Sequence, residues 1–390
     1  MKKFLATLLI VACALTASFV YAAIQTFDGH GEWHTNDDDK ADIAKARAQQ
    51  RAQLDAQKKA GVFLKTFSRT VDMELVDDEV NAVTANIIEL VGDVQFDKKI
   101  IPLSDQSTTI LYTATLQARI DPDSIFDFVG RVDKGKIVSQ NNSLQDLIQR
   151  NDEQAAALTE QFNQAETQDE LDELRRQLDE ADREFLANQK FEDGLKCYYA
   201  KDYDGAIRLY NEALDLNPNW DFAYNNLAMA YNDLGQYERA IADYDKAIEL
   251  NPNDADFYFN RGSTYKNLKQ FDRAIQDYNQ ALKLNPNDAD TYNNRGFVYD
   301  ELEQYDLAIA DYDKALELNP KLEVAYNNRA IAFIALGNID RAIADATKAI
   351  QLNPNFADAY YVRGLCYQEL GDEAKAQADL DKAKELGSDD

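Results

Sequence analysis

The two histidines of the chain, His30 and His34, lie near its amino terminus and are followed by an acidic run at 37–39. On a helix, this spacing of four would bring both imidazoles to one face, where they could bind a single Zn²⁺ together with a carboxylate. Gly29 and Gly31 oppose a helix, however, and favour a strand or a structureless leader. The acidic run also lacks the spacing and the glycine of a calcium loop. We therefore expect no metal site.

Motifs that perform catalysis are absent from the rest of the sequence. It has no glycine loop of the kind that cradles phosphate, no HExxH zinc motif and no GxSxG nucleophile motif. A nucleophilic triad would need one of the two leader histidines. The sequence therefore predicts a protein that is not an enzyme, with no catalytic residue and no cofactor. An enzyme or metal protein that uses His30 and His34 is the alternative.

The composition favours packed domains and excludes two classes of partner. Hydrophobic residues make up 45% of the chain, which is enough to build cores. The formal net charge is −29, and a surface of this sign repels nucleic acid and anionic lipid headgroups. We therefore expect neither nucleic acid nor a membrane surface as a partner.

The amino terminus has the pattern of an export signal. Two lysines precede an uncharged apolar stretch over 4–20, and Ala22 and Ala23 offer a site for a signal peptidase. The stretch is short for a membrane span. Retention as an anchor, or lipidation at Cys13, are the alternatives. We predict a signal peptide over 1–22 and an exported bacterial protein, periplasmic or associated with the cell envelope, without a membrane span after cleavage.

A period of 34 residues dominates the carboxyl-terminal half. Around each repeated proline the same pattern returns, with a small residue at the eighth position, an aromatic at the eleventh and an alanine at the twentieth. Small residues let two helices approach closely, and the proline ends the second helix. The prolines that mark the period are Pro218, Pro252, Pro286, Pro320 and Pro354.

This pattern, as in "AYNNLAMAYNDLGQYERAIADYDKAIELNPN", identifies the chain as a member of the tetratricopeptide repeat family over about half its length. The resemblance implies a mainly α fold, a right-handed solenoid of six helical hairpins. Cys197 and Cys366 would lie in the first and last hairpins, too far apart for a disulfide. The expected repeats are 187–220, 221–254, 255–288, 289–322, 323–356 and 357–390.

The last repeat has the pattern of an end. Positions 21 and 28 are leucine or isoleucine in the first five repeats, but Gln377 and Lys384 in the sixth. Residues seven apart share one helical face, so both changes fall on the same surface. A terminal repeat needs such a polar outer face, and we expect nothing to stack beyond it.

The family resemblance implies that the first helix of each repeat lines a concave wall that holds a peptide or a protein surface. Asparagines at its fifth and sixth positions resemble the ladder by which the sugar-transferring members grip an extended peptide, and repeats one and six depart from it with Glu192 and Val362. A carboxamide offers a peptide unit two donors and one acceptor. The alternative is that these asparagines are solvated consensus residues that bind no partner. The predicted groove residues are Asn225, Asn226, Asn260, Asn293, Asn294, Asn327 and Asn328.

Arginines occupy the seventh position of the first helix in four repeats, where Leu227 stands in repeat two. They could receive a carboxylate of the partner. We favour the alternative, in which they form ion pairs with nearby acidic residues while their stems pack on tyrosines. The lysine and asparagine of the chaperone-binding clamp are absent, with Asn225 and Met229 in their places in repeat two. The arginines are Arg261, Arg295, Arg329 and Arg363.

Residues 23–130 follow a different pattern and predict a small α+β domain. We expect a helix over 42–60, a strand over 61–76, a helix over 80–91 and a strand over 110–120, where apolar and polar residues alternate. These elements would form one sheet with helices on one side.

Two further features belong to this domain. A helix is expected to open at Asp121-Pro122, and Trp33 to pack on the domain. The run "AKARAQQRAQLDAQKKAGVFLKTF" resembles the opening helix and strand of a small domain of exported bacterial envelope proteins, namely a lipoprotein family and the amino-terminal part of a flagellar assembly factor. This resemblance, over 36–130, implies a role in the cell envelope.

Between the two parts, 131–186 predicts a helical linker. Its apolar residues keep a three–four spacing, which suits a coiled coil or a helix that packs on the first repeat. We favour a helical spacer that caps this repeat, and a homo-oligomer formed through 140–186 is the alternative. The spaced residues are Leu171, Leu174, Leu178, Ala181 and Phe185.

Together these patterns predict an extracytoplasmic adaptor or scaffold that binds a protein or an extended peptide in the asparagine-lined groove of the solenoid. The alternative is an oligomeric structural scaffold of the bacterial envelope, assembled through the amino-terminal half, in which the repeats act as a spacer.

Overall fold

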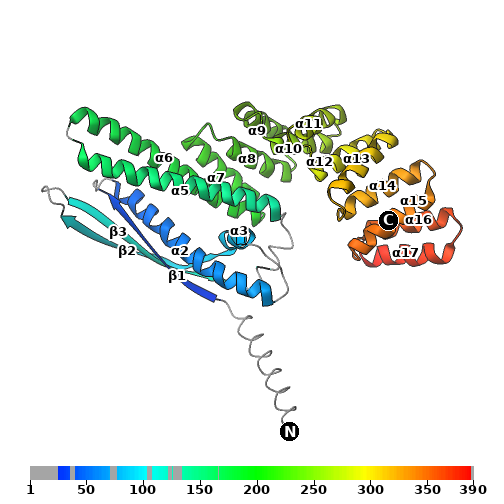
Figure 1. The fold of residues 1–390 in the computed structure, drawn as a ribbon, viewed down its shortest axis with the longest axis horizontal. Coiled ribbons are helices and arrows are strands. Elements are labelled where there is room, and N and C mark those ends of the chain that lie inside the picture. The colour runs from blue at the N-terminus through cyan, green and yellow to red at the C-terminus, as the bar shows by residue number, and fades with distance from the viewer. Residues whose placement is uncertain are drawn as a thin grey trace, which may run out of the picture. The chain divides into compact units, whose positions relative to one another are not determined.

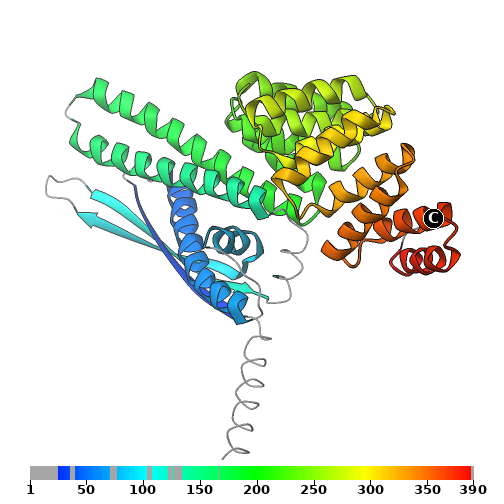
Figure 2. The ribbon, with the colours of Figure 1, turned by 45° about the vertical axis from the view of Figure 1, so that its right-hand side comes forward.

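The computed structural model describes residues 25–35, 40–70, 77–102, 108–121, 125, 134–165 and 167–387. The chain divides into two compact units, an amino-terminal unit (1–201 and 215–217) and a carboxyl-terminal unit (202–214 and 218–390), shown from two directions in Figures 1 and 2. The predicted signal peptide 1–22, Cys13 and Pro122 lie outside the described residues. No helix of the described residues is long and apolar enough to span a membrane.

A three-stranded antiparallel sheet forms one layer of the amino-terminal unit. Its strands are β1 (Gln25–Thr35), β2 (Glu89–Pro102) and β3 (Thr108–Ile120), in the order β1-β3-β2. Along β1 and β3 alternate side chains are buried, so one face of the sheet is covered and the other meets solvent. The predicted strand over 110–120 is confirmed, and its alternating apolar residues form the buried face.

Helix α2 (Ala41–Thr70) packs closely on the covered face (Figure 1). A stripe of buried alanines four residues apart faces β1, where the glycines of the leader remove the side chains that would obstruct it. A Cβ on Gly31 would lie 2.2 Å from the carbonyl oxygen of Ala48, and one on Gly29 would lie 2.1 Å from that of Ala52. The leader therefore forms a strand, one of its two expected states, and Trp33 is buried in the core as predicted.

Two predictions for this unit are wrong. The expected strand over 61–76 is helical as far as Thr70, because Leu64 continues the buried face of α2 and packs against Val80 and Val83 of α3. Helix α3 (Asp77–Ile87) ends four residues before the expected 91, and the chain enters β2. Strand β2 escaped prediction because a bulge between Val91 and Gln95 breaks its alternation.

Two long helices, α5 (Lys134–Gln164) and α6 (Gln168–Tyr199), pack against each other and contribute to the same core as α2 and the sheet. Thr167 and Glu170 form a capping box that starts α6. The predicted apolar seam of this helix turns toward the core, since Ala181 and Phe185 are buried. Helix α6 continues without a break across the expected boundary at 186/187.

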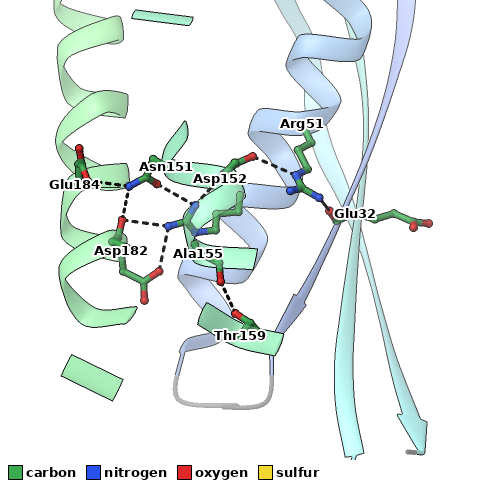
Figure 3. Close-up of polar contacts among 10 residues, drawn as sticks. Glu32, Arg51, Asn151, Asp152, Ala155, Thr159, Asp182 and Glu184 are labelled. Carbon is green, nitrogen blue, oxygen red and sulfur yellow. Dashed lines mark hydrogen bonds and ion pairs between the residues drawn. The ribbon is translucent and has the colours of Figure 1, made fainter. Parts of the chain in front are cut away.

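A buried arginine joins these helices, and Figure 3 labels the two aspartates that it binds, Asp152 and Asp182. The side chain of Arg47 in α2 has no exposed surface, and its guanidinium donates to Asp152 Oδ1 at 2.9 Å and Asp182 Oδ1 at 3.3 Å. It also stacks on the rings of Trp33 and Phe185, at 4.7 and 4.3 Å from their centres. Burial lowers the pKa of Arg47, and the two carboxylates oppose this shift. The hairpin α5–α6 is thus fastened to α2 through one buried charge.

The carboxyl-terminal unit holds the predicted tetratricopeptide solenoid except for the first helix of repeat one, which is the end of α6 in the amino-terminal unit. In repeats two to six each first helix packs on the second helix of its own repeat and against its neighbours. A Cβ on Gly296 would lie 2.8 Å from the ring of Tyr312, as expected of the small residue at the eighth position. Asp254 and Asp288 cap helices as acceptors. The helices are α7 (Tyr203–Leu216), α8 (Asp221–Asp233), α9 (Tyr237–Leu250), α10 (Ala255–Asn267), α11 (Phe271–Leu284), α12 (Ala289–Glu301), α13 (Tyr305–Leu318), α14 (Glu323–Ala335), α15 (Ile339–Leu352), α16 (Ala357–Glu369) and α17 (Glu373–Glu385).

The two sides of this stack are not equivalent. The first helices α8, α10, α12, α14 and α16 contact one another from repeat to repeat, whereas within 202–387 the second helices of neighbouring repeats approach each other less closely. The first helices therefore form the shorter, inner side of the stack, and we call their shared surface the first-helix wall. At the far end, Gln377 and Lys384 are exposed, as expected of a terminal repeat.

Candidate functional site

Polar side chains join successive helices of the first-helix wall. Side-chain hydrogen bonds link three neighbouring pairs of helices, α8 to α10, α10 to α12 and α12 to α14, and Thr264 adds a second bond from α10 to Asn232 of α8. The other three bonds each involve an asparagine that the sequence placed in the groove. These three bonds run from Asn260 Nδ2 to Asn225 Oδ1 (3.0 Å), from Lys266 Nζ to Asn294 Oδ1 (2.7 Å) and from Asn328 Nδ2 to Asn293 Oδ1 (3.1 Å).

These bonds limit what the asparagines can offer a partner. Asn226 donates instead to the carbonyl of Phe222, one turn back in its own helix, and Asn294 does the same to Asp290. Only Asn294 and Asn328 are partly accessible, and the other five are buried. Five of the seven predicted asparagines thus take part in bridges between repeats. Asn226 bonds within its own helix, and Oδ1 of Asn327 is buried without a hydrogen-bond partner among the described residues. Their role in holding a peptide stays a prediction.

The four arginines form a repeated staple, which we define as the seventh-position arginine bound to an aspartate sixteen residues later in its own repeat. Nε and Nη2 of each guanidinium donate to that carboxylate, at 2.6–2.8 Å. The hydrogen bonds that Arg363 donates to the carboxylate of Asp379 raise the pKa of Arg363. The guanidinium groups also lie near aromatic rings, and that of Arg261 is 5.7 Å from the ring centre of Tyr258 and 6.0 Å from that of Tyr265. The staples are Arg261–Asp277, Arg295–Asp311, Arg329–Asp345 and Arg363–Asp379.

A third nitrogen of each fork reaches back to the second helix of the preceding repeat. The acceptor is a carboxylate for two arginines and a neutral oxygen for the other two. The arginines thereby hold neighbouring repeats together, as the favoured alternative requires. The pairs are Arg261–Asp245, Arg295–Asn279, Arg329–Asp313 and Arg363–Thr347.

Repeat two lacks the staple because Leu227 replaces the arginine. Asp243, which holds the aspartate position there, makes no hydrogen bond or ion pair with any residue that the structure describes. Partial burial without a compensating cation raises the pKa of Asp243 to about 6.

Sequence reasoning missed the exposed apolar side chains of the wall. Phe297 and Ile331 occupy the ninth position of α12 and α14 and are 36% and 40% exposed. Val324, two turns before Ile331, is 40% exposed. The ninth position is also apolar at Met229 and Leu365, so reading this column of the repeats would have found the feature.

The leader histidines do not converge. His30 and His34 lie in β1 on the solvent face of the sheet, and four residues of strand separate them by roughly 13 Å. Among the described residues, no three His, Cys, Asp or Glu side chains gather as metal ligands would. Cys197 and Cys366, the cysteines that the structure describes, form no disulfide, and burial raises the pKa of Cys366 to about 11.

The amino-terminal unit has one further accessible apolar feature. Leu90, Phe96 and Ile100 of β2 are paired with buried residues of β3, so they point to the covered face of the sheet. They nevertheless stay exposed, Ile100 by 61%. The reason is that α2 packs on β1 and β3 and leaves the edge strand uncovered.

Comparison with known proteins agrees with the repeat assignment. Family models described as TPR repeat or tetratricopeptide repeat match 209–242, 228–269, 255–288, 289–322, 324–356 and 346–378. The small glutamine-rich tetratricopeptide repeat-containing protein 2 of Mycosarcoma maydis is 40% identical over 52 residues, which are 13% of this chain and 15% of that protein. This chain therefore matches only a small part of that relative.

Two solved structures are similar to less than half of the chain. The MamA protein is 30% identical, with a TM-score of 0.40 over 44% of this chain and 94% of that one. YrrB, described as a TPR protein with an unusual peptide-binding site, is 29% identical, with a TM-score of 0.40 over 47% of this chain and 95% of that one. With its matches to the family models and its stack of 34-residue helical hairpins, the chain belongs to the tetratricopeptide repeat family.

Proposed function

We propose that this protein is a scaffold whose protein or peptide partner docks on the first-helix wall. The observation that carries this proposal is the exposed apolar surface of Phe297, Ile331 and Val324 on two adjacent first helices. Exposed apolar side chains gathered on one surface are typical of interaction sites. The partly accessible amides of Asn294 and Asn328 lie on the same helices and can bond a peptide backbone.

A scaffold role needs no catalytic group, and none of the site residues described above is arranged for proton transfer or nucleophilic attack. The shape and chemistry of the first-helix wall would determine which partner binds. We therefore propose binding without catalysis as the activity of the carboxyl-terminal unit.

Site-specific photo-crosslinking tests this assignment. A photoreactive phenylalanine analogue replaces Ile331 on the wall or, as a matched control, Leu307 on the second helix α13, which is 50% exposed. The full-length protein is expressed in its own host and irradiated. We expect a discrete adduct from position 331 and none from position 307. Equal adducts at both positions, or adducts only at 307, would contradict the proposal.

We also propose that the protein acts outside the cytoplasm, in the periplasm or at the cell envelope. The support is the lysine-flanked apolar stretch over 4–20 and the small residues that follow it. Sequencing the amino terminus of the protein from fractionated cells is the direct test. A new terminus after Ala22 or Ala23 in the periplasmic or envelope fraction is expected, and an intact Met1 in a cytoplasmic fraction would refute export.

A second candidate function is an oligomeric envelope scaffold assembled through the amino-terminal half. It is favoured by the uncovered apolar residues of β2, above all Ile100. The apolar seam of α6 supports it less, because that seam already packs in the core of its own chain. Light scattering on the mature chain decides: an oligomer that Ile100→Lys converts to a monomer would support this function, and a monomer at all concentrations would exclude it.

A further inference from the structure

An apolar patch on repeats four and five forms the centre of the proposed docking surface. We define the patch as Phe297, Val324 and Ile331. The bond from Asn328 to Asn293 ties α12 to α14 at 3.1 Å. Phe297 lies one turn beyond Asn293, and Ile331 lies one turn beyond Asn328. Both apolar residues therefore lie within one turn of this joint between the helices, and Val324 lies on the same face of α14 as Ile331, two turns earlier.

The edge of the patch toward repeat three is closed by a cation of the chain itself. Lys266 in α10 donates to Asn294 at 2.7 Å, and its ammonium lies 5.4 Å from the centre of the Phe297 ring. Burial lowers the pKa of Lys266. A cation beside an aromatic face is attractive, so this position already shows the kind of group that Phe297 accepts.

Toward repeat five the sign of the charge changes. Asp300 holds in α12 the repeat position that Lys266 holds in α10, and it lies one turn beyond Phe297. Its Oδ1 is buried without a hydrogen-bond partner among the described residues, and no arginine or lysine pairs with it there. Burial raises the pKa of Asp300 to about 6. Near it, the hydroxyl of Tyr312 is also buried without a hydrogen-bond partner in the described part of the chain, and burial together with the charge of Asp300 raises the pKa of this hydroxyl. A half-buried carboxylate without a cation is an unfavourable arrangement, which a cation at the second carboxylate oxygen would relieve.

The surroundings add to this negative field. Glu301 follows Asp300 and is exposed. Repeat four, over 289–322, has eight acidic and three basic residues, so acidic side chains exceed basic ones by five. A partner that brings positive charge would be steered to this edge, and a second copy of the same acidic chain would be repelled.

Resting on the scaffold function proposed above, we infer that the partner presents a cationic, apolar segment, with aliphatic or aromatic side chains on Phe297 and Ile331 and a lysine or arginine at Asp300. The apolar side chains supply contact area. The cation supplies orientation along the wall, because Lys266 at one edge of the patch would repel it and Asp300 at the other would attract it.

Three fluorescein-labelled peptides of equal length test this chemistry on the mature full-length chain. The first is built of leucine and lysine, the second of leucine and glutamate, and the third of serine and lysine. By fluorescence anisotropy we expect the leucine–lysine peptide to bind about tenfold or more tighter than either of the others. Its affinity should fall with salt, since exposed charges are screened. Equal or tighter binding of the leucine–glutamate peptide would overturn the inference.

Variants place the interaction on the patch. Ile331→Ser should weaken the leucine–lysine peptide by about tenfold. Asp300→Asn should weaken it several-fold while leaving an uncharged leucine–serine peptide unchanged. Leu307→Ser on the outer helix α13 is the matched control, and we expect it to change neither affinity. Circular dichroism melting confirms that each variant is folded.

The outcomes separate the two proposals. If Asp300→Asn has no effect while position 331 still gives a crosslink, the partner docks on the wall but is not cationic, and only the inferred chemistry fails. If no peptide binds and position 331 gives no crosslink, the scaffold function itself fails. If binding responds to Leu307→Ser and not to Ile331→Ser, the patch is not the docking site.

Discussion

Replacing Arg47 with alanine should destabilise the amino-terminal unit more than any other single loss of charge in α2. The change removes a fully buried guanidinium that binds Asp152 and Asp182 and lies between the rings of Trp33 and Phe185. Breaking a buried ion pair by removing one partner costs about 3–5 kcal/mol. Arg51 and Lys40 still neutralise the two aspartates, which lowers this cost, and the lost stacking adds about 1–2 kcal/mol.

We therefore expect a loss of about 4 kcal/mol in the free energy of unfolding of this unit. The chain has two tryptophans, and they report on different units, Trp33 on the amino-terminal and Trp220 on the carboxyl-terminal one. In a Trp220→Phe background, tryptophan fluorescence follows only the amino-terminal unit. At a slope of about 2 kcal/mol per molar urea, Arg47→Ala should lower the midpoint by about 2 M.

Two variants control this experiment. Lys45→Ala removes a cation from the same helix whose only described partner, Asp42, is fully exposed, so its cost should stay within about 0.5 kcal/mol. Arg47→Lys keeps the charge but loses the planar fork, and we expect an intermediate loss. If Arg47→Ala shifts the midpoint no more than Lys45→Ala does, the buried network contributes no net stability and the reasoning is refuted.

Three further predictions concern close packing, the staple and an unpaired carboxylate. Gly31→Ala should destabilise the amino-terminal unit by about 3 kcal/mol in the same fluorescence assay. Gly61→Ala is the control: its Cβ would meet nothing nearer than 3.6 Å, so it should stabilise the unit by about 0.5–1 kcal/mol. Similar effects of both variants would contradict the tight β1–α2 contact. A double-mutant cycle of Arg329→Ala and Asp345→Ala, read by thermal unfolding, should give a coupling of about 1–2 kcal/mol, and strict additivity would argue against the staple. The pKa of Asp243 in the folded state is about 6, above its ordinary 3.8, so its ionisation opposes folding and stability is lost as pH rises from about 4 to about 6. Asp243→Asn should therefore stabilise the protein by about 1 kcal/mol at pH 7 and have little effect at pH 4. An equal effect at both pH values would contradict this origin.

The solenoid could be predicted almost completely because its determinants are local and repeated. Each proline, small residue and aromatic acts within its own hairpin, and the same 34-residue pattern recurs around five prolines along the chain. The staples could also have been predicted, since an aspartate follows each seventh-position arginine sixteen residues later. What the period could not show is the use of the asparagines, because whether Asn225 faces solvent or Asn260 depends on how two helices meet.

The amino-terminal unit was harder to predict because its determinants are distant. Nothing near Arg47 in the sequence distinguishes it from Arg51, and its partners Asp152 and Asp182 come more than a hundred residues later. The strand expected over 61–76 was wrong over 61–70, where α2 continues, and the alternating residues that suggested it lie at 71–75, outside the described part of the chain. Strand β2 was missed because Gly92, at φ 71°, interrupts the alternation that would reveal it.

The third guanidinium nitrogen of each staple arginine binds a charged acceptor at some junctions between repeats and a neutral acceptor at others. The joints after repeats two and four close on exposed carboxylates, Asp245 and Asp313, whereas the others close on the neutral side chains of Asn279 and Thr347. Ionic attraction at an accessible position fades in concentrated electrolyte, and a neutral hydrogen bond hardly responds. Concentrated salt would therefore soften every second joint, so that the rod bends in segments of two repeats and not uniformly along its length.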